Sequence, residues 1–301
     1  MSQTMLQLVQ QVTAELNLAV PTYVAGNPSQ DVQQVFALLN AAGYELTKEY
    51  DWEALSKEYR FYTNYVNTIG SCIENEYIIT GIPSTAGLSS NFMVTGNSFP
   101  QDTYITSVDS LTQVTVSQKC SATQIQQSVL FSQTIYPLPT DFETITDSTQ
   151  WDKSKHWQML GAESAQQWQW LKSGYISTGP RVRWRILGGK FQIWPPMNTS
   201  EYLGFEFRSN GWAESATGTV QQQFIADTDT TLFDDRLMVL YTKLKYFQVK
   251  SFDTTALTQD YMRYLSIIKA NDKGSPNLSF APQPSRVLIG YANIPDTGYG
   301  S

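Results

Sequence analysis

The spacing of apolar residues changes twice along the chain, and this pattern restricts the possible folds more than any other feature. Near the N-terminus, apolar residues recur every three or four positions, as in an amphipathic helix: Met5, Leu8, Val9, Val12 and Leu16. The same spacing occurs in residues 32–46 and returns in residues 237–268. The long stretch between them is rich in Ser, Thr and Gly, with short alternating runs typical of strands. The sequence therefore predicts an α+β fold in which helices from both chain ends form one antiparallel bundle.

These changes divide the chain into four predicted parts. They are a helical bundle (1–56 and 233–273), a β-rich platform region (57–68 and 131–232), an inserted all-β module of about five strands (69–130) and an extended C-terminal arm (274–301). The arm contains several prolines and glycines and has no amphipathic period, so we expect it to form no core of its own.

Two smaller elements are expected in the platform region. Gly188 and Gly189 separate two strand-like runs, residues 182–186 and 190–194, which is a strong signal for a β-hairpin. Residues 161–172 have a composition that suits a short helix.

The charge balance argues against a protein that is held on nucleic acid by a basic patch. Lys and Arg number 20 against 27 Asp and Glu, which gives a net charge of −7. An acidic channel through which DNA slides without adhering remains compatible with this charge. Only 16% of the residues are charged, well below the usual value of about 25%. A surface so poor in charge is often partly covered by partners, and β-rich extracellular proteins have a similar composition.

The sequence offers no targeting signal and little redox chemistry. The first residues lack the basic and apolar segments of a secretory signal, and no apolar run approaches the roughly 20 residues of a membrane span. Two cysteines, Cys72 and Cys120, are too few for a disulfide framework or a zinc site, so we expect reduced thiols in a protein synthesised in cytoplasm.

The motifs of catalysis and metal binding are weak. The single histidine, His156, lies in a polar, loop-like stretch, which favours a surface position over a catalytic triad. An EF-hand alignment of the aspartates at 227, 229, 234 and 235 fails, because Leu232 and Met238 replace the required Gly and Glu. Those carboxylates instead suit the N-terminus of the helix that follows. A pair of carboxylates for glycoside hydrolysis stays open, although no pair stands out. We therefore expect no enzyme activity, no cofactor and no metal site.

Eight tryptophans are the most unusual part of the composition. Packing in a thin β layer is the commonest role for such residues, followed by protein interfaces and then by sugar stacking. The candidates for a docking surface or subunit interface are Trp157, Trp168, Trp170, Trp194 and Trp212.

Several stretches resemble a known family in their order along the chain. They are Asp31-Val32 and Tyr50–Leu55, then Tyr136–Phe142, then Phe191–Pro196 with Phe205–Asn210, then Asp227–Thr230 before residues 237–268, and finally Ala292–Gly298. Together they resemble the head-to-tail adaptors of short-tailed bacteriophages, the group that includes tail tubular protein A and head-completion connectors. Residues 69–130 instead resemble a small β repeat common in phage structural proteins.

The resemblance implies a structural virion protein of the tail or neck. Members of this family form a dodecameric ring beneath the portal protein, extend the DNA channel and dock the next tail nozzle or tube protein. Double-stranded DNA passes through such a ring without specific binding, and no membrane is involved. These partners imply a role in virion assembly and DNA ejection.

The resemblance also implies that the C-terminal arm runs along the portal. The candidate portal-binding residues in the arm are Phe280, Arg286, Leu288, Ile289, Tyr291, Asn293, Ile294 and Pro295. Independently, scattered apolar residues in a Pro/Gly-rich segment suit a peptide that becomes ordered on a partner.

Two other classes of function stay open. A receptor- or glycan-binding tail protein would explain both the tryptophan cluster and the β module. A phage-encoded hydrolase would need an activity that depends on one carboxylate pair.

Overall fold

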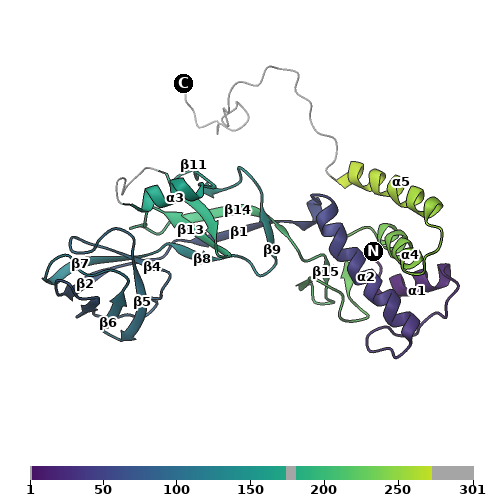
Figure 1. Cartoon of the computed structure of the whole chain (residues 1–301), viewed down its shortest axis with the longest axis horizontal. Helices are drawn as coiled ribbons and strands as arrows, with labels where there is room; N and C mark the ends of the chain where they lie inside the picture. Colours follow the sequence, from purple (N-terminus) through teal and green to yellow (C-terminus); the bar gives the residue numbers. More distant parts are fainter. Residues whose placement is uncertain (1, 174–180, 273–301) are drawn as a thin grey trace, which may run out of the picture.

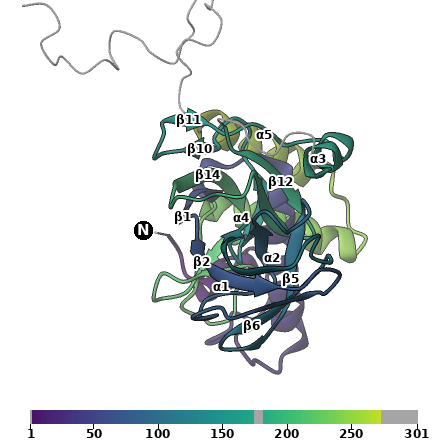
Figure 2. The ribbon, with the colours of Figure 1, turned by 90° about the vertical axis from the view of Figure 1, so that its left-hand side faces the viewer.

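A computed structural model of the chain describes residues 2–173 and 181–272, which contain five α-helices, one 3₁₀ helix and seventeen strands. The ribbon is elongated, with a β-barrel at one end, a group of helices at the other and twisted sheets between them (Figure 1). Viewed from the barrel end, strands β2, β5 and β6 lie in front of the helices, so the regions follow one another along the long axis (Figure 2).

The barrel is closed by six antiparallel strands in the order β2-β3-β6-β5-β4-β7. Its strands are β2 (Tyr65–Cys72), β3 (Ile78–Thr80), β4 (Phe92–Thr95), β5 (Thr103–Ser110), β6 (Gln113–Val116) and β7 (Gln124–Gln133). Apolar side chains from alternating strand positions fill the interior, among them Ile79, Val94, Val114, Val129 and Phe131. Tyr65 pairs with Ser132, so the chain enters and leaves the barrel at neighbouring positions, as expected of an insertion. The barrel is longer at both ends than the predicted module of residues 69–130, and it has one strand more.

The central region consists of two antiparallel sheets that enclose an aromatic core. The larger sheet contains β1 (Ser56–Tyr62), β9 (Phe142–Ile145), β10 (Trp151–Asp152), β11 (Trp157–Gln158) and β14 (Tyr202–Ser209), and the smaller contains β8 (Ile135–Pro137), β12 (Arg183–Leu187) and β13 (Lys190–Trp194). The ring of Phe191 stacks on Phe205 at 4.9 Å and on Trp184 at 5.6 Å between ring centroids. The predicted hairpin is confirmed, because β12 pairs with β13 across Gly188 and Gly189, which both have positive φ.

The short helix of this region, α3 (Ala165–Lys172), begins four residues later than predicted. Ser164 caps it: its hydroxyl accepts a hydrogen bond from the backbone N–H of Gln167, and the Gln167 side chain reaches back to the Ser164 backbone. This capping box fixes where the helix starts.

The helical region contains α1 (Met5–Glu15), α2 (Gln30–Glu49), η1 (Glu53–Leu55), α4 (Asp235–Val249), α5 (Thr255–Asp272) and a small sheet of β15 (Ala213–Glu214), β16 (Val220–Gln221) and β17 (Thr230–Thr231). These α-helices agree with the spacing of apolar residues, and Met5, Leu8, Val9 and Val12 are all fully buried. The core also includes residues outside the helices, namely Trp52, Trp212, Phe224 and Phe233.

The predicted fold class, α+β with an antiparallel bundle from both chain ends, is wrong. The described residues are mostly β, with a six-stranded barrel and several antiparallel sheets, and no helix bundle built from both termini is evident. The physical reason lies in the core, where α1, α2 and α4 pack against aromatic residues from loops and against Ala213 of a small sheet as well as against one another. Apolar spacing locates the helices but does not show what completes their core.

Candidate interaction surfaces

Three of the five candidate tryptophans are buried within the chain. The indole of Trp212 lies in the helical region against α2, so close that a Cβ atom at Gly43 would overlap the ring. Trp168 and Trp194 pack with Met93 and Leu171, where the barrel meets the central region. These three side chains therefore stabilise cores and are not part of an exposed docking surface, which corrects the prediction for them.

The other two candidates are partly exposed. Trp157, at the start of β11, is 42% exposed, and Trp170, in α3, is 47% exposed. Both views place β11 and α3 along the same side of the molecule as α5 (Figures 1 and 2). The spacing of apolar residues does not predict which of the five tryptophans are buried, because all five lie in short or irregular elements.

The predicted portal-binding residues of the arm, Phe280 to Pro295, lie outside the described residues. The arm follows directly from α5, which ends at Asp272. Any partner that engages the arm is therefore tethered to the helical end of the molecule.

Helix α5 packs against α4 and also exposes two large apolar side chains. Tyr261 and Leu265 are its buried residues, and the Tyr261 ring stacks on Tyr241 of α4 at 4.6 Å. Met262 and Ile267 on α5 are exposed, as are Val249 at the end of α4 and Phe252 in the turn before α5. We call these four exposed side chains the α5 surface. Beside Ile267, a groove of about 280 Å³ between α4 and α5 is lined by Arg236, Leu240, Asp260, Arg263 and Tyr264.

A second apolar area lies on the outside of the barrel. Cys72 of β2 pairs with Ile79 of β3 and with Gln124 of β7. The residues next to these three in sequence include Ile73, Ile78 and Ile125, so the three isoleucines lie near one another. Their exposed fractions are 63%, 37% and 79%, and Ile69 on the same strand as Cys72 is 43% exposed. We call these four isoleucines the barrel surface. This surface could be found in the sequence by searching for isoleucines at the outward-facing, otherwise polar positions of a predicted strand.

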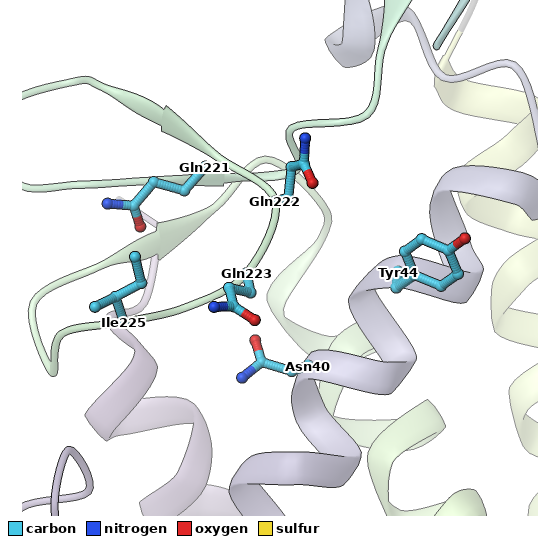
Figure 3. Close-up of a pocket in the computed structure, with 6 residues that line it drawn as sticks. All are labelled: Asn40, Tyr44, Gln221, Gln222, Gln223 and Ile225. Atoms are coloured by element: carbon cyan, nitrogen blue, oxygen red, sulfur yellow. The ribbon is translucent and has the colours of Figure 1, made fainter. Parts of the chain in front are cut away.

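A pocket of about 600 Å³, lined by several amide side chains, lies between α2 and residues 221–225 (Figure 3). Asn40 and Tyr44 line it from the helix, and Gln221, Gln222, Gln223 and Ile225 line it from the opposite segment. The side-chain oxygen of Asn40 accepts a hydrogen bond from the backbone N–H of Phe224 at 2.8 Å, which fixes this segment on the helix. The amides offer both donors and acceptors but no ionised group for acid–base chemistry.

The thiols and the histidine are poorly placed for catalysis. Cys72 and Cys120 are free and buried. Burial and the neighbouring Cys72 raise the pKa of Cys120 to about 12, so this thiol stays protonated and is a weak nucleophile. His156 is exposed in the turn between β10 and β11, with a positive φ.

The acidic cluster has structural roles, and only one member caps the helix as predicted. Asp234 accepts a hydrogen bond from the backbone N–H of Leu237 at the start of α4. Asp227 accepts hydrogen bonds from the backbone N–H groups of Val24 and Ala25, and Asp229 accepts from Ile225 and Ala226. Across the described part of the chain, no three His, Cys, Asp or Glu side chains gather as a set of metal ligands.

No family model matches the chain, and no curated protein matches it. Within residues 2–173 and 181–272, none of the helices combines the length and the apolar content needed to cross a lipid bilayer. Function is therefore inferred from the exposed surfaces.

Proposed function

We propose that the chain is a structural virion protein that forms a ring between a phage portal and its tail. In this role it extends the DNA channel and docks the next tail component, with its location in the tail or neck of the virion. The mechanism is assembly through protein contacts, not catalysis.

The observation that carries the proposal is the placement of apolar surfaces at both ends of an elongated chain. The α5 surface lies at the helical end and the barrel surface lies at the opposite end (Figure 1). Groups of exposed large apolar side chains occur at protein interaction sites. A connector needs two such sites that are far apart, because it must hold two partners at once.

A ring requires a contact between different faces of neighbouring subunits, repeated around an axis until it closes. The α5 surface suits one side of such a contact, because α5 buries only Tyr261 and Leu265 within its own chain. The arm begins at the end of the same helix, which favours a portal on this side of the ring. The net charge of −7 suits a channel that DNA crosses without adhering.

The experiment is to measure the oligomeric state of Met262→Asp by analytical ultracentrifugation. A buried carboxylate in an apolar contact is costly, so we expect the ring to dissociate into monomers. The matched control is Ala37→Asp, which places the same charge at an exposed position of α2. Assembly of Met262→Asp equal to that of the control would refute the role of the α5 surface.

A glycan-binding tail protein is the second candidate, and the exposed rings of Trp157 and Trp170 favour it. Aromatic faces of this kind stack on sugars, and the amide-rich pocket in Figure 3 suits hydroxyl groups. A free trimer that binds host glycans, with binding lost in Trp157→Ala, would support this candidate over the adaptor.

A further inference from the structure

The attachment of the barrel to the central region depends on Thr63, which lies between β1 and β2. Its backbone N–H donates to the carbonyl of Glu201 at 2.8 Å, and its hydroxyl oxygen accepts from the backbone N–H of Glu201 at 2.8 Å. The same hydroxyl donates to the carbonyl of Thr199 at 3.0 Å. Nearby, the Ser132 hydroxyl at the end of β7 donates to the carbonyl of Met197 at 2.5 Å. The segment 197–201 therefore holds both chain connections of the barrel.

The side chain of Glu201 is buried at this junction, with 3% of its surface exposed. Its Oε1 atom forms an ion pair with Lys155 and accepts a hydrogen bond from the Thr199 hydroxyl at 2.9 Å. Its Oε2 atom is also buried, and none of the described residues forms a hydrogen bond with it. A buried carboxylate oxygen without a donor is strongly unfavourable.

The group that can supply the missing donor is Asp152, which is buried at the end of β10. Its Oδ1 atom accepts from the backbone N–H groups of Ser154 and Lys155 at 3.0 and 3.1 Å. Asp152 pairs with Leu203 across β10 and β14, two residues from Glu201, and Lys155 contacts both side chains, Asp152 through its backbone N–H and Glu201 through its ammonium. Two facing carboxyl groups and a single ammonium, that of Lys155, leave one negative charge in excess, and one proton between the carboxyls removes it.

We propose that Asp152 and Glu201 share one proton, and that loss of this proton loosens the attachment of the barrel to the central region. The junction is then a pH-sensitive hinge, firm below the titration of the pair and weaker above it. This proposal does not depend on the partner that the chain meets.

The pKa values of the two carboxyl groups shift in opposite directions, as expected for a pair that shares one proton. Burial and the hydrogen bond with Glu201 raise the pKa of Asp152 to about 6, whereas hydrogen bonds from Asp152 and Lys155 outweigh burial and lower the pKa of Glu201. An unfolded aspartate titrates near pH 4, so the stability due to the protonated Asp152 is lost as pH rises through about 6. The ionised Glu201 contributes in the opposite sense, and that contribution is lost only at more acidic pH.

The other charged groups around the junction come from β1 and from the turn between β10 and β11. On β1, Glu58 pairs with Arg60 and Lys153, and hydrogen bonds from these two cations lower its pKa to about 2. Tyr202 stacks on Tyr62 at the outer side. The imidazole of His156 lies in the same turn as Lys155 and is exposed.

The test is hydrogen exchange of the full chain measured by mass spectrometry at pH 5 and pH 7.5, with rates corrected for intrinsic exchange. We expect protection in peptides covering residues 60–64 and 199–203 to fall about tenfold in the wild type, and to stay constant in α2. Asp152→Asn, which keeps a donor for Glu201, should remove this pH dependence. His156→Gln should retain it. Constant wild-type protection, or an unchanged response in Asp152→Asn, would overturn the proposal.

A second measurement needs no variant and covers the case in which Asp152→Asn does not fold. Infrared spectra of the wild type should contain a protonated carboxyl band at pH 5 that disappears by pH 7.5. Absence of this band at pH 5 would equally overturn the shared proton.

Discussion

Gly43 and Trp212 illustrate how a single contact decides the role of a side chain. The indole occupies the space beside α2 where any larger residue would have its Cβ atom, and it is fully buried. The sequence identifies Trp212 as an interface candidate, but it cannot reveal this pairing of residues 169 positions apart. The buried apolar residues of α1 are predictable because their spacing alone places them on one face.

At Gly43, replacement by alanine should destabilise the helical region. Overpacking against the indole is expected to lower the free energy of unfolding by about 1–3 kcal/mol. This exceeds or cancels the roughly 1 kcal/mol by which alanine favours a helix over glycine. Thermal unfolding followed by the helical circular dichroism signal measures the change. The penalty should shrink in a Trp212→Phe background, and an identical penalty there would contradict the contact.

The cap of α4 gives a second prediction at this scale. Asp234→Ala removes the acceptor for the Leu237 N–H, so we expect a loss of about 1 kcal/mol of stability. Asp234→Asn keeps an oxygen at the same place and should retain most of it. Equal unfolding temperatures for the alanine variant and the wild type would show that the cap is unimportant.

Elements defined by local spacing were predictable, and elements defined by long-range pairing were not. The helices at residues 5–15, 30–49, 235–249 and 255–272 and the hairpin at Gly188-Gly189 follow from local pattern and turn chemistry. Strand β1 instead pairs with β14 across Tyr59 and Phe205, which are far apart in sequence. The small sheet that completes the helical core consists of two-residue strands, which have no recognisable period.

The barrel has its own core, so damage to it should remain local. Phe131→Ala removes a fully buried ring and is expected to cost the barrel about 3–5 kcal/mol. Hydrogen exchange should accelerate in β2 and β7, while α2 and α4 keep their protection. Equal loss of protection in both regions would show that the barrel and the helical region unfold as one unit.

At the scale of the whole molecule, the chain is elongated and exposes apolar side chains at both ends. The chain resembles head-to-tail adaptors in the order of several short sequence stretches. The ring and the portal and tail partners remain predictions. The elongated shape with an apolar surface at each end is the feature that a connector requires.

Native mass spectrometry of the full chain, alone and mixed with its portal ring, tests the central claim most directly. The account predicts a portal complex that carries a complete ring of this chain and is lost when residues 275–301 are deleted. A chain that does not bind the portal, or a free trimer that is indifferent to it, would contradict the account.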